Sequence, residues 1–137
     1  MTIGQGTGAD HDWNWIDEDV TLAAHDAMLA EFGGLVGARD LSAMQSALAR
    51  PRNIAAYGSP DAAALAAVYA YGLSRNHPFS DGNKRTGYAL AIVFLLDNGL
   101  AFTGSDIESV EAMLAVAEGT MSEDDLAAWF RARVERL

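Results

Sequence analysis

The sequence of 137 residues contains no cysteine, which excludes disulfide frameworks, thiolate metal clusters and cysteine nucleophiles. A chain without cysteine suits a reducing cytoplasm, which is the localisation we expect. Positive charge is also scarce: 9 Lys and Arg stand against 19 Asp and Glu, a formal net charge of −10. Such an acidic balance argues against a broad basic face for nucleic acid or anionic lipid. We therefore expect neither direct nucleic-acid binding nor membrane docking.

Long apolar runs and strand patterns are missing as well. The uninterrupted apolar run at residues 88–96 is about half of what a membrane crossing needs. No region shows the period-two alternation typical of a sheet, so the expected fold class is all-α. The polar, glycine-rich start predicts a disordered tail over residues 1–15. Residues 16–137 are long enough for a single compact domain.

Helical spacing and boundary residues predict a compact bundle of about six helices. The predicted starts are Asp17, Asp40, Ser59-Pro60, Gly82, Ser105 and Ser122, and the predicted ends are Gly33-Gly34, Pro51, Asn76, Asn98-Gly99, Gly119 and the C-terminus. The stretch 50–59 lacks helical periodicity and predicts a loop or short hairpin that serves as a flap. The helix that opens near Gly82 is apolar on every face, so we expect it at the centre of the bundle.

The few cations are concentrated in one segment. A third of them, Arg75, Lys84 and Arg85, fall between residues 75 and 85, and Lys84 is the only lysine. This segment leads into the N-terminus of the predicted central helix, where free N–H groups and the helix dipole favour an anion. Gly82 allows an anion to approach the backbone closely. A phosphate is the expected ligand.

Three other residues of this segment each allow two interpretations. Asp81 is either an ordinary N-cap or a ligand for a Mg²⁺ that bridges phosphate oxygens. Asn83 is either a helix-start residue or a phosphate donor. His77 either hydrogen-bonds the loop or takes a proton from an attacking hydroxyl. Phe79 is expected to anchor the loop in the core.

The pair His25-Asp26 invites comparison with metal-dependent HD phosphohydrolases. That class needs further histidine ligands, and the chain offers only His11 and His77. A structural or loop-supporting His25 is therefore the favoured interpretation over a metal cluster.

The run from His77 to Arg85, HPFSDGNKR, resembles the Fic motif, HxFx(D/E)GN followed by a variable residue and Arg. Lys84 makes it similar to the Doc (death on curing) branch of the Fic/Doc family. The resemblance extends to four further stretches and covers about residues 16–136. Those stretches are LAAHD at 22–26, GGLVG at 33–37, LARP at 48–51 and AVAEG at 115–119.

This resemblance implies the Fic/Doc fold and a toxin of a toxin–antitoxin pair. Doc-type proteins are kinases that transfer the γ-phosphate of ATP to a threonine of translation elongation factor Tu. Fic proteins proper transfer AMP, with Gly at position 84 and a second Arg at position 88, where this chain has Lys84 and Tyr88. Both departures favour phosphorylation; the alternatives are an AMP transferase and a catalytically silent binding module.

The resemblance also implies residue roles. His77 would be the general base and Asp81 would hold Mg²⁺. The residues that position the phosphate and neutralise its charge would be Arg75, Gly82, Asn83, Lys84 and Arg85, of which Lys84 and Arg85 are also catalytic. The flap residues Arg52, Asn53 and Tyr57 would dock the protein substrate.

Inhibition is expected to come from a separate protein. Some Fic proteins carry an inhibitory (S/T)xxxE(G/N) helix, and Glu118-Gly119 matches its end. Position 114, however, is Leu where the motif requires Ser or Thr. We therefore expect a cognate antitoxin that folds as a helix in a groove on this domain.

Overall fold

The structure is a computed structural model and describes residues 12–137. In this part of the chain it has six α-helices and one small antiparallel sheet of two strands. The elements are α1 (Glu18–Phe32), α2 (Leu41–Tyr57), α3 (Ala62–Asn76), α4 (Asn83–Asp97), β1 (Leu100–Phe102), α5 (Asp106–Glu118), α6 (Glu123–Arg131) and β2 (Val134–Arg136). The predicted all-α bundle is confirmed.

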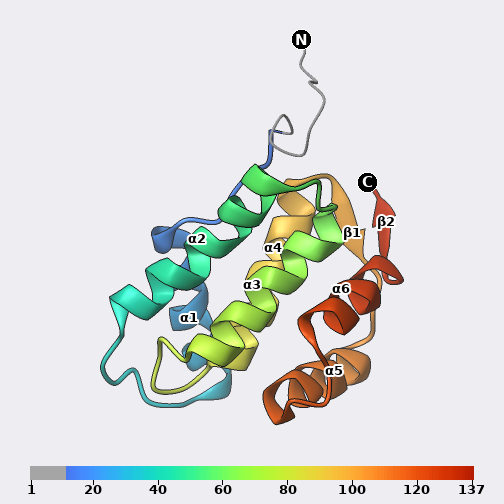
Figure 1. The fold of residues 1–137 in the computed structure, drawn as a ribbon. Coiled ribbons are helices and arrows are strands. Elements are labelled where there is room, and N and C mark those ends of the chain that lie inside the picture. The colour runs from blue at the N-terminus through green and yellow to red at the C-terminus, as the bar shows by residue number, and fades with distance from the viewer. Residues whose placement is uncertain (1–11) are drawn as a thin grey trace.

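Helix α3 lies in the middle of the bundle, between α2 and α6 (Figure 1). Eleven of its fifteen residues are buried, because alanines and other small side chains let neighbouring helices approach on several sides. Helix α4, which we expected at the centre, packs against α3 along its length. Seven residues of α4 are buried, so the two helices share the central position and α3 is the more enclosed.

Side-chain caps fix the start of five of the six described helices. Asp17, Asp40, Asp61, Ser105 and Ser122 each accept a hydrogen bond from a main-chain N–H of the first turn. Such a cap satisfies one of the N–H groups that a helix start leaves without a partner. The caps predicted at Asp17, Asp40, Ser105 and Ser122 are confirmed, whereas α3 is capped by Asp61 instead of beginning at Ser59-Pro60.

The predicted flap is wrong. Pro51 does not end the second helix but lies inside α2, which continues to Tyr57. A proline inside a helix removes one hydrogen bond and costs about 3 kcal/mol. The helix continues because Pro51 and Ala55 lie on the same buried face as Met44 and Leu48. This packing outweighs the local preference.

Both ends of the domain also differ from the prediction. Helix α6 does not reach the C-terminus, since Val134–Arg136 forms β2 and pairs with β1. Most of the predicted tail, residues 1–11, lies outside the described residues. The tryptophans Trp13 and Trp15 pack against Phe94 with ring centroids 5.8 and 5.9 Å away. Order therefore begins earlier in the chain than residue 16. In the described part, no helix combines the length and apolar character that a membrane crossing needs.

Candidate active site

The segment His77–Gly82 connects α3 to α4, as the sequence predicts, and we call it the motif loop. His77 ends α3 in a left-handed conformation, with φ 49° and ψ 54°. This conformation turns the chain sharply out of the helix and leaves His77 exposed. Phe79 points inward and is 4% exposed, which confirms that it anchors the loop in the core.

The buried side chain of Asn83 fixes the shape of the motif loop. Its Oδ1 accepts a hydrogen bond from the Phe79 N–H at 3.0 Å, and its Nδ2 donates to the Phe79 carbonyl at 2.8 Å. These two bonds define the orientation of the amide, so the second N–H of Nδ2 faces Nδ1 of His77 at 3.3 Å. Nδ1 of His77 is therefore the hydrogen-bond acceptor of the ring. The Asn83 side chain is occupied within the loop, which leaves its main-chain N–H for a ligand.

Helix α4 begins without a side-chain cap, unlike the other five described helices. Its N-cap is Gly82, in a left-handed conformation with φ 83°. The interpretation of Asp81 as the N-cap is wrong, because its Oδ2 accepts a hydrogen bond from the Leu35 N–H at 2.8 Å. The first-turn N–H groups of α4 thus remain available for an anion.

The same turn carries positive charge that no carboxylate neutralises within the described residues. The four ion pairs within residues 12–137 all involve other cations, namely Arg39, Arg50, Arg131 and Arg133. Lys84 and Arg85 are exposed, and the Arg85 guanidinium carbon lies 4.6 Å from the centre of the Phe32 ring. In an acidic protein, two such cations at an uncapped helix N-terminus favour an anion such as a phosphate.

A second segment, residues 33–40, lies against the motif loop, and we call it the glycine segment. The Asp40 N–H donates to the Pro78 carbonyl at 2.7 Å, and Leu35 holds the Asp81 carboxylate. Figure 1 shows the two segments side by side at one end of the bundle. Sequence reasoning assigned no site role to the glycine segment, although its glycines mark it as unusual. Gly34 lies so close to the loop that a Cβ there would be 3.1 Å from the Cβ of Asp81.

The position of Asp81 suits a magnesium ligand. It is exposed, and only one of its carboxylate oxygens accepts a hydrogen bond in the described part of the chain. No group of three or more His, Cys, Asp or Glu that could hold a metal occurs within residues 12–137. Mg²⁺ commonly takes one or two carboxylates and completes its shell with phosphate oxygens and water. A single carboxylate beside a phosphate site fits that pattern.

His25 lies beneath the motif loop and is fully buried. Its ring stacks on Phe79, with centroids 3.7 Å apart and the planes 9° from parallel. Its Nε2 lies 2.8 Å from the Asp81 carbonyl oxygen. The loop-supporting interpretation of His25 is confirmed.

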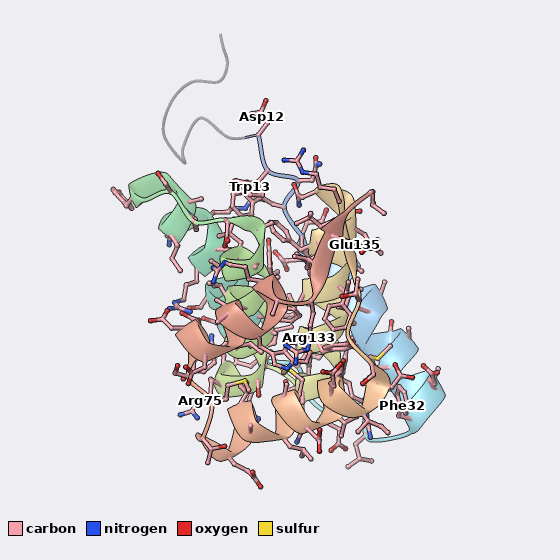
Figure 2. All side chains as sticks on the ribbon, turned by 90° about the vertical axis from the view of Figure 1, so that its right-hand side faces the viewer. Asp12, Trp13, Phe32, Arg75, Arg133 and Glu135 are labelled. Carbon is pink, nitrogen blue, oxygen red and sulfur yellow. The ribbon has the colours of Figure 1, made fainter. Side chains whose placement is uncertain are left out.

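Four predicted site residues do not join this cluster. Arg75 lies over Tyr71, and Figure 2 shows it on the opposite side of the molecule from Phe32, which Arg85 contacts. Arg52, Asn53 and Tyr57 lie on α2 instead of on a flap. The N-cap of α2 contacts the motif loop, so Tyr57, at the far end of the helix, is separated from the loop by about 25 Å of helix.

Tyr88 points away from the candidate site. Its hydroxyl lies 2.9 Å from the Ser109 hydroxyl on α5, and its ring meets Phe102 edge-on. Burial raises the pKa of Tyr88. A residue held in this way contributes no charge to a phosphate at the start of α4.

The helical bundle, with the motif loop leading into an uncapped helix, defines the class of protein: an all-α domain of the Fic type. The sequence profile of the Fic/DOC family matches residues 15–95, and the chain belongs to this family. It is 31% identical over 113 residues to "Protein kinase doc" of Escherichia phage P1, covering 82% of this chain and 89% of that protein. It is 36% identical over 116 residues to "Toxin Doc" of Mycolicibacterium smegmatis, covering 81% and 85% of the two chains.

Proposed function

We propose that the protein is the toxin of a toxin–antitoxin pair and acts as a protein kinase. It would transfer the γ-phosphate of ATP to a threonine of translation elongation factor Tu and so arrest translation. One of the two similar proteins is named as a protein kinase and the other as a toxin. The observation that carries the proposal is the uncapped start of α4, with Lys84 and Arg85 on its first turn.

The chain's own residues supply the elements of phosphoryl transfer. The first-turn N–H groups of α4, together with Lys84 and Arg85, bind the terminal phosphates and neutralise charge that develops during transfer. The threonine oxygen bonds to the γ-phosphorus while the bond from that phosphorus to the bridging oxygen of ADP breaks. His77, whose ring is exposed at the end of α3, takes the threonine proton on its imidazole.

Asp81 would hold the magnesium ion. When bound, the ion neutralises phosphate charge and orients the phosphate oxygens for in-line attack. The contact from the Leu35 N–H fixes one oxygen of the Asp81 carboxylate and leaves the other for the ion. Removing Mg²⁺ with EDTA should therefore abolish transfer, and added Mg²⁺ should restore it.

ATP labelled separately at the α- and the γ-phosphate tests the proposal. Purified protein is incubated with elongation factor Tu and with ATP labelled at either the α- or the γ-phosphate. We expect label on the factor only from the γ-position. Label from the α-position alone would make the protein an AMP transferase, and no label from either position would favour a binding module. Arg85→Ala should lose the transfer, whereas Arg136→Ala, at the distant strand β2, should keep it.

The toxin role is tested in cells. Induced expression in bacteria should stop growth, and co-expression of the cognate antitoxin, a partner expected to dock as a helix, should restore it. His77→Asn should remove the toxicity. If the His77→Asn protein were as toxic as the parent chain, the phosphotransfer mechanism would be excluded and simple binding to a partner favoured.

A further inference from the structure

Arg39 and His25 form a contact that determines where protons lie beneath the motif loop. Nη2 of Arg39 lies 3.0 Å from Nδ1 of His25 and 2.6 Å from Oδ1 of Asp26. A guanidinium only donates hydrogen bonds, so Nδ1 of His25 must be the acceptor. The proton of the neutral His25 ring is therefore on Nε2.

This tautomer is the one that the motif loop requires. Nε2 of His25 faces the Asp81 carbonyl oxygen at 2.8 Å, and a carbonyl oxygen only accepts hydrogen bonds. With the proton on Nδ1 instead, the lone pair of the fully buried His25 ring would face a lone pair of the Asp81 carbonyl oxygen. The donor contact from Arg39 thus excludes the tautomer that would repel Asp81.

Asp81 is consequently held at two points from two different segments. His25 holds its main-chain carbonyl from below, and the Leu35 N–H holds its carboxylate from the glycine segment. Arg39 belongs to that same glycine segment, and its guanidinium carbon lies 5.8 Å from the centre of the Phe79 ring. Arg39 therefore contacts His25, which holds Asp81 from below, and Phe79, which anchors the motif loop in the core.

We propose that Arg39 is a positioning residue, which sets the tautomer of His25 and thereby aims the Asp81 carboxylate at the divalent cation. The inference rests on the proposed function for the role of the cation, but not for the tautomer or the aim of the loop. Groups that orient a metal ligand commonly change metal affinity by about 10- to 100-fold when they are removed. Arg39 would belong to this kind of support.

The first experiment measures the His25 tautomer and hydrogen exchange at Leu35 in the metal-free protein. ¹⁵N spectroscopy of the His25 ring should show the proton on Nε2 in the parent chain and a mixture of tautomers in Arg39→Met. Hydrogen exchange at the Leu35 N–H should accelerate at least tenfold in Arg39→Met, because the Asp81 carboxylate loses its fixed place. Arg39→Lys, which keeps a cationic donor, should restore both signals.

A matched control separates positioning from general loss of stability. Arg131→Met also removes an arginine from a carboxylate at 2.6 Å, but at Asp61, at the opposite end of α3 from His77. It should leave the His25 and Leu35 signals unchanged. Asp26→Asn removes the ion pair yet keeps the contact between Arg39 and His25, and should also leave the tautomer unchanged. A parent-like His25 tautomer in Arg39→Met would overturn the proposal, and so would a shift of equal size in Arg131→Met.

The second experiment measures how much Mg²⁺ the phosphate transfer requires. The Mg²⁺ concentration that gives half-maximal phosphate transfer should rise by about tenfold in Arg39→Met, with the rate at saturating Mg²⁺ within about threefold of the parent. A fall in the saturated rate with an unchanged Mg²⁺ requirement would overturn the assignment of Arg39 to the cation site. If the parent transfers no phosphate, the proposed function fails, while the tautomer and exchange measurements still decide the positioning role.

Discussion

His77 combines an unusual backbone with an exposed ring at the point where α3 ends. It is the only non-glycine residue with positive φ in the part of the chain that the structure describes. Histidine and asparagine enter the left-handed region more readily than alanine. A substitution at position 77 therefore changes both the ring chemistry and the end of a helix, and the two effects need to be separated.

Two variants of His77 separate them. His77→Asn should leave the free energy of unfolding within about 0.5 kcal/mol of the parent, because Asn tolerates the left-handed region, whereas His77→Ala should lose about 1 kcal/mol. Both should slow phosphate transfer by about 10²- to 10⁴-fold, the usual contribution of a general base. Urea unfolding and labelled-ATP transfer measure the two quantities. Transfer within a few-fold of the parent in His77→Asn would exclude His77 as the base.

Tyr69 illustrates a buried residue whose role is structural. Its hydroxyl accepts a hydrogen bond from the buried Ile16 N–H at 3.0 Å. Tyr69→Phe would leave that N–H buried without a partner, and should lower the free energy of unfolding by about 1–3 kcal/mol. Tyr57→Phe is the control and should change little, since Tyr57 is 93% exposed. Equal effects of the two variants in urea unfolding would contradict this assignment.

The pH dependence of Tyr69 has a definite sign. Burial raises the pKa of Tyr69 to about 12. In the unfolded chain the pKa of a tyrosine is about 10. The stability that the neutral Tyr69 phenol gives to the folded state is therefore fully present below that pH. This stability is lost as the pH rises from about 10 through 12. The free energy of unfolding of the parent should therefore fall relative to that of Tyr69→Phe over this range.

At the scale of elements, the contact between α3 and α4 depends on one glycine. A Cβ at Gly87 would lie 2.8 Å from the Ala70 carbonyl oxygen, closer than packed atoms allow. A Cβ at Gly72, also inside a buried helix, would lie 3.6 Å from its nearest neighbour, which is ordinary contact. The two glycines thus provide a matched pair, one that packing requires and one that it does not.

Substituting alanine at these two glycines should change the free energy of unfolding in opposite directions. Gly87→Ala should destabilise by about 1–3 kcal/mol, because overpacking outweighs the gain in helix propensity. Gly72→Ala should stabilise by about 0.5–1 kcal/mol, because only the propensity gain remains. Thermal and urea unfolding of both variants measure the difference. Stabilisation in both would show that α3 and α4 can move apart at Gly87 without cost.

A structural feature can be predicted from the sequence when the residues that cause it lie close together in the chain. The caps at Asp17, Asp40 and Ser105 were predictable because a cap depends on residues three positions away. The continuation of α2 through Pro51 was not, because it depends on a buried face packed against other helices. The flap prediction failed for the same reason.

The candidate site divides in the same way. The motif loop was predictable from nine consecutive residues, His77 to Arg85. Its support by the glycine segment was not, since the contact between Leu35 and Asp81 joins residues 46 positions apart. Which cations join the site also depends on folding. Arg85 and Arg75 are close in sequence but lie on different sides of the bundle.

At the scale of the whole molecule, the carboxylates fall into two groups: some are held by an arginine or a main-chain N–H, and others are not. The Arg131 guanidinium lowers the pKa of Asp61, and the Ser105 N–H together with Arg133 lowers that of Glu108. A carboxylate with a lowered folded pKa adds stability above its unfolded pKa of about 4, and this stability is lost as the pH falls through the folded value. These pairs therefore persist at pH values where unpaired carboxylates begin to take up protons.

This difference predicts that the effect of salt on stability changes with pH. At pH 7 the formal net charge is −10, and the excess carboxylates repel one another. Raising NaCl from about 0.01 to 0.1 M shortens the screening length from about 30 to 10 Å and so weakens this repulsion. The melting temperature should rise by a few degrees, since exposed ion pairs contribute only about 0–1 kcal/mol each. Near pH 4.4, the sequence pI, repulsion is small while the pairs remain, so salt should leave the melting temperature unchanged or lower it. An equal rise at both pH values would show that salt acts through general exclusion from the surface instead of through the charge of the chain.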